Sequence, residues 1–392
     1  YKRQLCDRQL RNAEVGLGSK FDGFPHQTGF DIVAASEVMT IMALAQDTED
    51  LRERLGRIVV AYNTSEKPVY ARELNCIGSL CVILKDALKP NLVQTCEHTP
   101  VFVHCGPFGN IAHGSNSVRA TRLALKLAPY VVTEAGFAAD LGAEKFVNIK
   151  CRQAGLKPNA AVLVATIRAL KYHGGVEKDD LKIENLEALK TGCENLKTHA
   201  ENVQKYGLPV VVAINRFPTD TPAELEIVSK YCEEIGVESS LSEVVARGGK
   251  GGLDLANKIK RIVDETPGTP NFYYKDTDPI KRKIETVARE IYRADGVDYT
   301  EEAEASILRL EENGLADWPI CMAKTQASLS DDPKKRNAPR GWRLQVREVK
   351  VSNGAGFIVA LTGKMMLMPG MPRESAVQRI DIDSEGRITG LS

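Results

Sequence analysis

A segment rich in glycine and polar side chains follows the β-branched run Val101–His104. It spans Cys105–Gly114, contains His113, and precedes a segment of helical character that starts near Ser117. Glycines let a backbone approach a ligand closely, and the amides at a helix start attract anions. The segment is therefore a candidate anion-binding loop. A surface turn followed by a helix that Ser117 or Asn116 caps explains the same residues equally well.

A second polar segment, Glu134–Asp140, follows the run Tyr130–Thr133. It places a carboxylate, a glycine and the aromatic ring of Phe137 at the end of a predicted strand. In an open parallel sheet, ligands bind beyond the carboxyl ends of the strands, so this position suits a binding residue. A single phenylalanine at such a place is, however, more often part of a hydrophobic core.

A third polar segment follows Val210–Ile214 and contains Phe217 next to Pro218. An aromatic ring beside a rigid proline offers a flat surface on which a planar heterocycle can stack. The alternative is an ordinary connection to a helix that starts near Pro222 and is capped by Asp220 or Thr221. The residues alone slightly favour this alternative.

Three basic side chains follow the run Ala161–Thr166, namely Arg168, Lys171 and His173. Their combined charge suits a phosphate or a carboxylate, although such a cluster is more often a solvated face. His113 and His173 have no second ligand at helical spacing, so we expect no metal site. No pattern of a covalent nucleophile is present either.

The phosphate-binding pattern Gly-x-x-x-x-Gly-Lys-[Ser/Thr] is absent from the chain, and Gly248–Gly252 resembles it only in composition. The residues considered so far therefore specify loops that can hold an anionic, partly planar ligand. They do not say which ligand this is.

The elements that would position these loops alternate between short β-branched runs and longer segments of helical period. Such alternation predicts an α/β fold with a largely parallel sheet and crossover helices. The predicted strands are Ile58–Ala61, Val101–His104, Tyr130–Thr133, Ala161–Thr166 and Val210–Ile214. Long helices are predicted over Asp31–Gln46, with Asp31 as cap, and over about Glu184–Tyr206, which ends before a glycine and a proline.

The 392 residues are enough for two or three domains, and we expect boundaries near residues 200 and 325. The predicted domains are 1–200, 201–325, which contains charged amphipathic helices from Leu253 onward, and 326–392, a small mixed or β subdomain with a hairpin turn at Asp383–Gly386. With 52 basic and 52 acidic residues, the chain has no net charge that would attract nucleic acid or a membrane surface.

Nine cysteines without zinc spacing indicate reduced thiols and a cytoplasmic location. No membrane span and no signal peptide are expected. Because the chain opens at Tyr1 in a charged segment, we expect it to be cut from a longer protein.

Several long segments resemble formate:tetrahydrofolate ligases. The most specific is Val164-Ala-Thr-Ile-Arg-Ala-Leu-Lys-Tyr-His-Gly-Gly175. Others are Thr28–Met39, Gly106–Gly114, Thr133–Phe146, Ala213–Thr221 and Met368–Pro372. The resemblance spans essentially the whole chain. An unrelated nucleotide-dependent α/β enzyme would require these matches to be coincidence.

The resemblance implies a P-loop-NTPase-like, mostly parallel sheet with helices on both faces and two smaller α/β subdomains. It also implies that MgATP and formate give formyl phosphate, which N10 of tetrahydrofolate then attacks. The motif matches assign the pterin pocket to Phe137, Phe217, Pro218 and Leu241. They place the nucleotide or phosphate neighbourhood at Gly106, Asn110, His113, Gly114, Glu134 and Asn215.

The chain departs from the family pattern at two places. Val245 stands where the family often has a tryptophan that completes the pterin sandwich. The family's P-loop and formyl-phosphate residues correspond to positions upstream of Tyr1, so the resemblance implies catalytic residues there and an inactive segment without them. A truncated paralogue that binds folate or nucleotide without catalysis is the alternative.

The resemblance further implies a homo-oligomer and leaves open a requirement for a monovalent cation. It does not separate a monofunctional ligase from part of a multifunctional enzyme.

Overall fold

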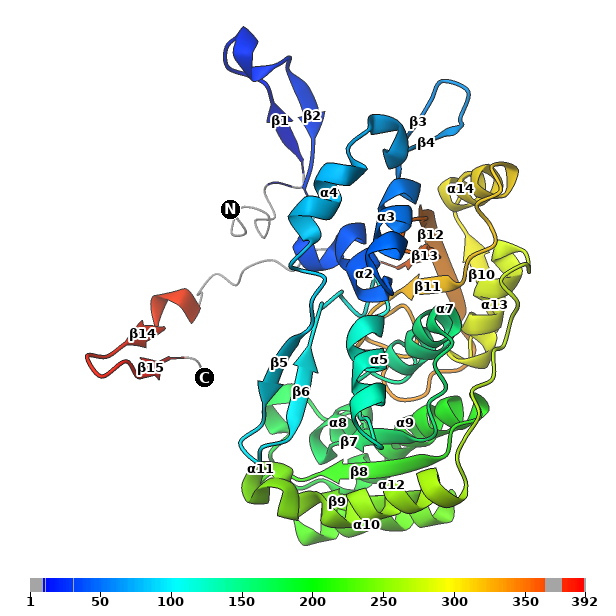
Figure 1. Cartoon of the computed structure of the whole chain (residues 1–392). Coiled ribbons are helices and arrows are strands. Elements are labelled where there is room, and N and C mark those ends of the chain that lie inside the picture. The colour runs from blue at the N-terminus through cyan, green and yellow to red at the C-terminus, as the bar shows by residue number, and fades with distance from the viewer. Residues whose placement is uncertain (1–9, 11, 31, 364–375, 391–392) are drawn as a thin grey trace. The chain divides into compact units, whose positions relative to one another are not determined.

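The computed structural model describes residues 10, 12–30, 32–363 and 376–390. The chain divides into two compact units, one made of residues 1–36 and 366–392 and the other of residues 37–365. Figure 1 labels most of the helices and strands of the two units. The domain boundaries expected from the sequence near residues 200 and 325 stay a prediction.

The described part of the first unit consists of two small antiparallel hairpins and short 3-10 turns. These elements are β1 (Ala13–Val15), η2 (Lys20–Asp22), β2 (His26–Thr28), η3 (Val33–Ala35), η8 (Ala376–Gln378), β14 (Asp381–Ile382) and β15 (Ile388–Thr389). The Asp383 carboxylate accepts the amides of Glu385 and Arg387, and Gly386 has a φ of 81°. The hairpin turn predicted there is confirmed, while Met368–Pro372 lies outside the described residues.

The second unit begins with helices and two hairpins. These are α2 (Glu37–Leu44), α3 (Thr48–Arg57), β3 (Val59–Tyr62), β4 (Pro68–Tyr70), η4 (Ala71–Leu74), α4 (Ile77–Leu84), β5 (Asn91–Gln94), β6 (Pro100–Val103) and α5 (Val118–Leu127). Ile41, Leu51 and Leu55 are buried in one apolar cluster with Phe357 from a distant strand. This cluster fixes the first helices against the end of the second unit.

The helix predicted over Asp31–Gln46 is shorter in the structure. Ser36 is extended, with a ψ of 138°, and the α-helix starts only at Glu37. An extended residue cannot belong to an α-helix, so the prediction is wrong for its first turns. Asp31, the predicted cap, lies outside the described residues.

The middle of the second unit contains a parallel sheet in the order β7-β8-β9. Its elements are α6 (Gly142–Lys145), the π-helix η5 (Phe146–Cys151), α7 (Arg152–Ala154), β7 (Ala161–Ala165), α8 (Ile167–His173), η6 (Lys178–Asp180), α9 (Leu186–Lys205), β8 (Val210–Asn215), α10 (Pro222–Glu234), β9 (Glu238–Ser242), α11 (Val244–Arg247), η7 (Gly248–Gly252) and α12 (Leu253–Glu265). β8 is buried over its first five residues because it is the central strand. Helices α9, α10 and α12 pack on the sheet.

The helix predicted over Glu184–Tyr206 is confirmed as α9. The Asn185 side chain caps its start by accepting the amide of Ala188. Its end is followed by Gly207, whose φ is 77°. A polar cap and a left-handed glycine are the two signals by which a sequence marks helix ends, and both are present here.

The last part of the second unit forms a mixed four-stranded sheet in the order β10-β12-β13-β11. Its elements are α13 (Ile280–Glu290), β10 (Gly296–Tyr299), α14 (Glu301–Glu312), β11 (Ile320–Ala323), β12 (Arg343–Ser352) and β13 (Phe357–Thr362). β12 and β13 are antiparallel, and each has a parallel neighbour. The α/β class predicted from the sequence is confirmed.

Two of the predicted strands lie in the parallel sheet and two others lie in hairpins. β7 and β8 match the predictions closely, whereas β3 and β6 pair antiparallel with β4 and β5. The strand predicted at Tyr130–Thr133 is wrong: among the described residues no strand lies beside it, and the Val132 side chain is 93% exposed. A strand needs a neighbour to satisfy its backbone hydrogen bonds. In the described part of the chain, no helix combines the length and apolarity that a membrane crossing requires.

Candidate active site

The parallel register brings several predicted ligand-binding residues to one edge of the β7-β8-β9 sheet. Ala165 pairs with Ile214, and Ile214 pairs with Leu241. The residues that follow these pairs therefore leave the sheet at the same edge. They include Phe217 and Pro218, which the sequence assigned to the site, and Asn215 is the last residue of β8, where it pairs with Ser242.

Phe217 lies in a turn that its own backbone and Asp220 hold closed. The Phe217 amide donates to Asp220 Oδ2 at 2.7 Å, and the Asp220 amide donates to the Phe217 carbonyl at 3.0 Å. Asp220 is buried, so this bond is shielded from water. The helix cap is Thr221, whose hydroxyl accepts the amide of Glu224. The predicted helix connection is thus present, and it also fixes the Phe217 ring.

Arg168 covers one face of the Phe217 ring. Its guanidinium carbon lies 4.4 Å from the ring centroid, and Nη2 donates to Thr219 Oγ1 at 3.2 Å. Pro218 is exposed, and the Leu241 side chain is 38% exposed. The edge therefore presents an aromatic ring, a proline and a leucine beside a positive charge.

The basic cluster predicted after β7 divides into three different roles. Arg168 stacks on Phe217, whereas Lys171 is fully buried and forms an ion pair with Glu224 at 2.7 Å. His173 Nδ1 accepts the amide of Asn337, and burial lowers its pKa to about 4. A solvated face is therefore the wrong interpretation for Lys171 and His173, because both hold packed segments together.

The glycine-rich loop after β6 packs against the segment that contains Phe137. Ser115 and Ala135 form an isolated antiparallel bridge, and Gly109 lies so close to the Phe137 ring that an added Cβ would be 3.1 Å from Phe137 Cδ2. Phe137 has a φ of 31°, and its side chain is 53% exposed. In the described residues no hydrogen bond or ring contact joins this group to the Phe217 edge, so the predicted pterin residues fall into two clusters.

The predicted phosphate residues differ in exposure. Gly106 and Glu134 are exposed, Gly114 is half-buried, and His113 is fully buried. Asn110 has a buried side-chain oxygen without a hydrogen-bond partner. The loop thus combines an exposed rim with a polar interior.

Ser117 caps α5, as one of the two predictions stated. Its hydroxyl accepts the Ala120 amide at 3.0 Å and lies 2.7 Å from His104 Nδ1. Asn116 does not cap the helix and instead donates to the Phe102 carbonyl.

A family model described as formate–tetrahydrofolate ligase matches residues 2–392. The chain belongs to this family. The matched residues include both clusters and nearly the whole chain. Membership in the family supports formate–tetrahydrofolate ligase activity with ATP and tetrahydrofolate as substrates. The resemblance stated from the sequence motifs is confirmed.

The ligase also contains buried charged residues that the sequence analysis missed. Glu144, Lys145 and Lys150 are all fully buried. Burial raises the Glu144 pKa to about 7 and lowers the Lys150 pKa to about 8. Their burial could have been predicted from their position between apolar residues in Leu141–Cys151, where a charged side chain has little access to water.

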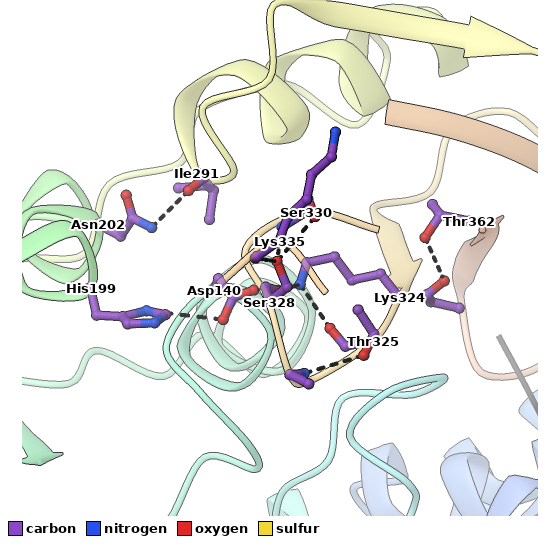
Figure 2. A network of polar contacts seen from close by, with 12 residues as sticks. Asp140, His199, Asn202, Ile291, Lys324, Thr325, Ser328, Ser330, Lys335 and Thr362 are labelled. Atoms are coloured by element: carbon purple, nitrogen blue, oxygen red, sulfur yellow. Dashed lines mark hydrogen bonds and ion pairs between the residues drawn. The ribbon is translucent and has the colours of Figure 1, made fainter. Parts of the chain in front are cut away.

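A second buried network holds the segment that follows Phe137 in place. Lys324 forms an ion pair with Asp140 at 2.8 Å and donates to the carbonyls of Thr325 and Ser328. Figure 2 shows Asp140 between Lys324 and His199, whose Nδ1 is 3.9 Å from Asp140 Oδ1. Asp140 is only three residues from Phe137. Its ion pair with Lys324 therefore also fixes the backbone on that side of the Phe137 ring.

Groups of three or more His, Cys, Asp or Glu side chains that could hold a metal ion do not occur in the described part of the ligase.

Proposed function

We propose that this ligase binds the pterin of tetrahydrofolate at the carboxyl edge of β7-β8-β9, with the Phe217 ring as the stacking surface. The observation that carries the proposal is the Arg168–Phe217 contact at 4.4 Å. Because Arg168 covers one face of the ring, only the other face is available for a planar ligand. Pro218 and Leu241 supply apolar surface beside it.

The proposed reaction proceeds through formyl phosphate. A formate oxygen attacks the terminal phosphorus of ATP, which forms a P–O bond and releases ADP. The N10 lone pair of tetrahydrofolate then attacks the formyl carbon, and phosphate leaves as the C–N bond forms and N10 loses its proton. Magnesium would neutralise phosphate charge when bound with ATP.

The residues of this chain support the attack of N10 on formyl phosphate more directly than the formation of formyl phosphate from ATP. Phe217 and Phe137 would orient the pterin so that N10 faces the acyl carbon, and positioning of this kind accounts for a large part of catalysis. The glycine-rich loop up to Gly114 and the exposed Glu134 would border the phosphate side. We further propose a reducing compartment such as the cytoplasm, because all eight described cysteines are free.

The proposal is tested by titrating the protein with tetrahydrofolate and following pterin fluorescence, for the wild type and for Phe217→Ala. The matched control is Phe272→Ala, because Phe272 is also partly exposed and lies 4.2 Å from an arginine, Arg152. We expect Phe217→Ala to weaken binding at least tenfold and Phe272→Ala to leave it unchanged. Equal affinities for Phe217→Ala and the wild type would rule out the stacking site.

A ligase assay separates the proposed reaction from the alternative of folate binding without catalysis. Formation of 10-formyltetrahydrofolate that depends on ATP and formate supports the enzyme. Saturable folate binding without turnover in a folded sample supports the binding protein.

A further inference from the structure

Five lysines are buried among the described residues, and three of these five have charged partners or several hydrogen-bond partners. They are Lys145, Lys150, Lys171, Lys283 and Lys324. Lys171 and Lys324 form ion pairs with buried carboxylates at 2.7 and 2.8 Å. Lys283 donates to three backbone carbonyls at 2.6 to 2.8 Å. Because an ammonium has three N–H donors and a full charge, these arrangements show what a buried lysine requires.

Lys145 and Lys150 lack such partners. Lys145 Nζ donates to the Gly109 carbonyl at 2.7 Å. Lys150 Nζ donates to Thr121 Oγ1 at 3.0 Å. All of these partners are neutral, and within the described chain neither ammonium has a carboxylate inside ion-pair distance. Neither lysine is therefore held in an ion pair. The nearby Glu144 carboxyl interacts electrostatically with Lys145 without forming an ion pair, and Lys150 Nζ lies 5.2 Å from the centroid of the Phe146 ring.

The loop that accepts the Lys145 hydrogen bond contains further unpartnered groups. Both ring nitrogens of His113 are buried without a hydrogen-bond partner, and so is the Ser115 hydroxyl. Burial, together with the charges of Lys150 and Lys145, lowers the His113 pKa to about 3, so the ring is neutral and has one N–H to donate. Natural proteins leave few buried polar groups unpaired, and a concentration of them in one loop indicates a missing ligand.

We propose that Lys145, Lys150 and His113 bind the phosphoryl group of a phosphorylated substrate. A phosphoryl group brings the negative charge that the two lysines lack and several oxygens that accept their free N–H donors. Lys150 lies in a π-helix, η5, a rare conformation that is frequent at functional sites. The identity of the phosphorylated substrate rests on the proposed function, in which ATP and formyl phosphate both carry such a group.

Entry to this site requires movement of the loop Cys105–Gly114, because His113, Lys145 and Lys150 have no exposed surface. The loop contains three glycines, and Cys105 and Gly114 have φ values of 60° and 59°. Binding is therefore best measured at equilibrium.

The test compares thermal unfolding in millimolar sodium phosphate, sodium formate and sodium chloride at equal ionic strength. The variants are Lys145→Met, Lys150→Met and, as the matched control, Lys324→Met. We expect phosphate to raise the unfolding midpoint of the wild type above its value in chloride, because a ligand that binds only the folded state stabilises it. Formate should have no such effect.

The three variants should differ in a diagnostic way. Lys145→Met and Lys150→Met should lose the increase with phosphate without a lower midpoint in chloride, since each removes a buried charge that is not in an ion pair. Lys324→Met should have a lower midpoint in chloride, since it leaves Asp140 unpaired, but should keep the increase with phosphate. An equal increase in all variants, or a formate effect in place of the phosphate effect, would overturn the proposal.

Phosphorus NMR provides a second measurement if a methionine variant fails to fold. The wild type and Lys150→Arg, which keeps the charge, should both broaden the resonance of inorganic phosphate, and excess ATP should reverse the broadening. No broadening with folded wild-type protein would contradict the site. Phe217→Ala should broaden it as the wild type does, so failure of the folate site and failure of the phosphoryl site are distinguishable.

Discussion

Glu224 holds Lys171 through one carboxylate oxygen and the backbone of Thr221 through the other. Oε1 accepts Lys171 Nζ at 2.7 Å, and Oε2 accepts the Thr221 amide at 3.0 Å. Both side chains are buried, with exposures of 1% and 0%. The pair thus joins helix α8, which follows β7, to the turn that carries Phe217.

Lys171→Met is expected to lower the free energy of unfolding by about 3 to 5 kcal/mol, because it leaves the Glu224 carboxylate buried and unpaired. Urea denaturation measures this change. Lys190→Met is the control, since Lys190 forms an exposed pair with Glu187 and should change stability by no more than about 0.5 kcal/mol. Adding Glu224→Gln should restore part of the loss, and a double variant as unstable as Lys171→Met would contradict the explanation.

Arg168→Ala is expected to weaken tetrahydrofolate binding by roughly twofold to thirtyfold, because a cation over an aromatic face contributes about 0.5 to 2 kcal/mol. The effect should disappear in the Phe217→Ala background, where no ring remains to hold. Pterin fluorescence titrations of the two single variants and the double variant measure this coupling. Arg216→Ala is the control on the same turn, because Arg216 pairs with Glu243 instead. Additive effects of Arg168→Ala and Phe217→Ala would show that the two residues act separately.

The local features of this fold were predictable from short stretches of sequence. Asn185 and Gly207 mark the ends of α9, and the all-apolar run at Val210 marks the central strand of the parallel sheet. The Phe217 turn was predicted as a helix connection, and Thr221 does cap that helix. These features depend on residues within a few positions of each other, which is why pattern and propensity suffice for them.

The burial of the charged residues was not predictable in the same way. Lys171 and Glu224 are 53 residues apart, and Asp140 and Lys324 are brought together from different parts of the second unit. Tyr130–Thr133 has the composition of a strand, but no strand among the described residues lies beside it. Such outcomes depend on long-range packing, which a single sequence pattern does not encode.

Glu144→Gln is expected to gain stability relative to the wild type as the pH rises from about 4.5 to about 7. Burial raises the Glu144 pKa to about 7, so the folded state prefers the protonated carboxyl. This preference contributes its full stability to the wild type below about pH 4.5, the pKa of Glu144 in the unfolded state. The contribution is lost as the pH rises through the pKa of Glu144 in the folded state. The difference should reach about 3 kcal/mol near neutral pH, at about 1.4 kcal/mol per pH unit.

Urea denaturation of both proteins at a series of pH values measures this difference. The amide of glutamine keeps an acceptor for Asn148 Nδ2, which now donates to Glu144 Oε1 at 2.8 Å. The two proteins should therefore be similarly stable near pH 4. A difference that does not change with pH would mean that Glu144 is ionised in the folded protein.

Gly109→Ala is expected to weaken tetrahydrofolate binding severalfold if Phe137 contributes to the pterin pocket. A Cβ at Gly109 would lie 3.1 Å from Phe137 Cδ2, which is closer than ordinary van der Waals contact, so the ring must move by a few tenths of an ångström. Gly106→Ala in the same loop is the control, because a Cβ there meets nothing within 4 Å.

Fluorescence titration with tetrahydrofolate compares Gly109→Ala, Gly106→Ala and Phe137→Ala. Gly109→Ala should resemble a weaker form of Phe137→Ala, because it displaces the ring without removing it. If Phe137→Ala binds tetrahydrofolate like the wild type while Phe217→Ala does not, the pterin pocket is confined to the β7-β8-β9 edge, and the Phe137 cluster then belongs to the phosphate side of the site alone.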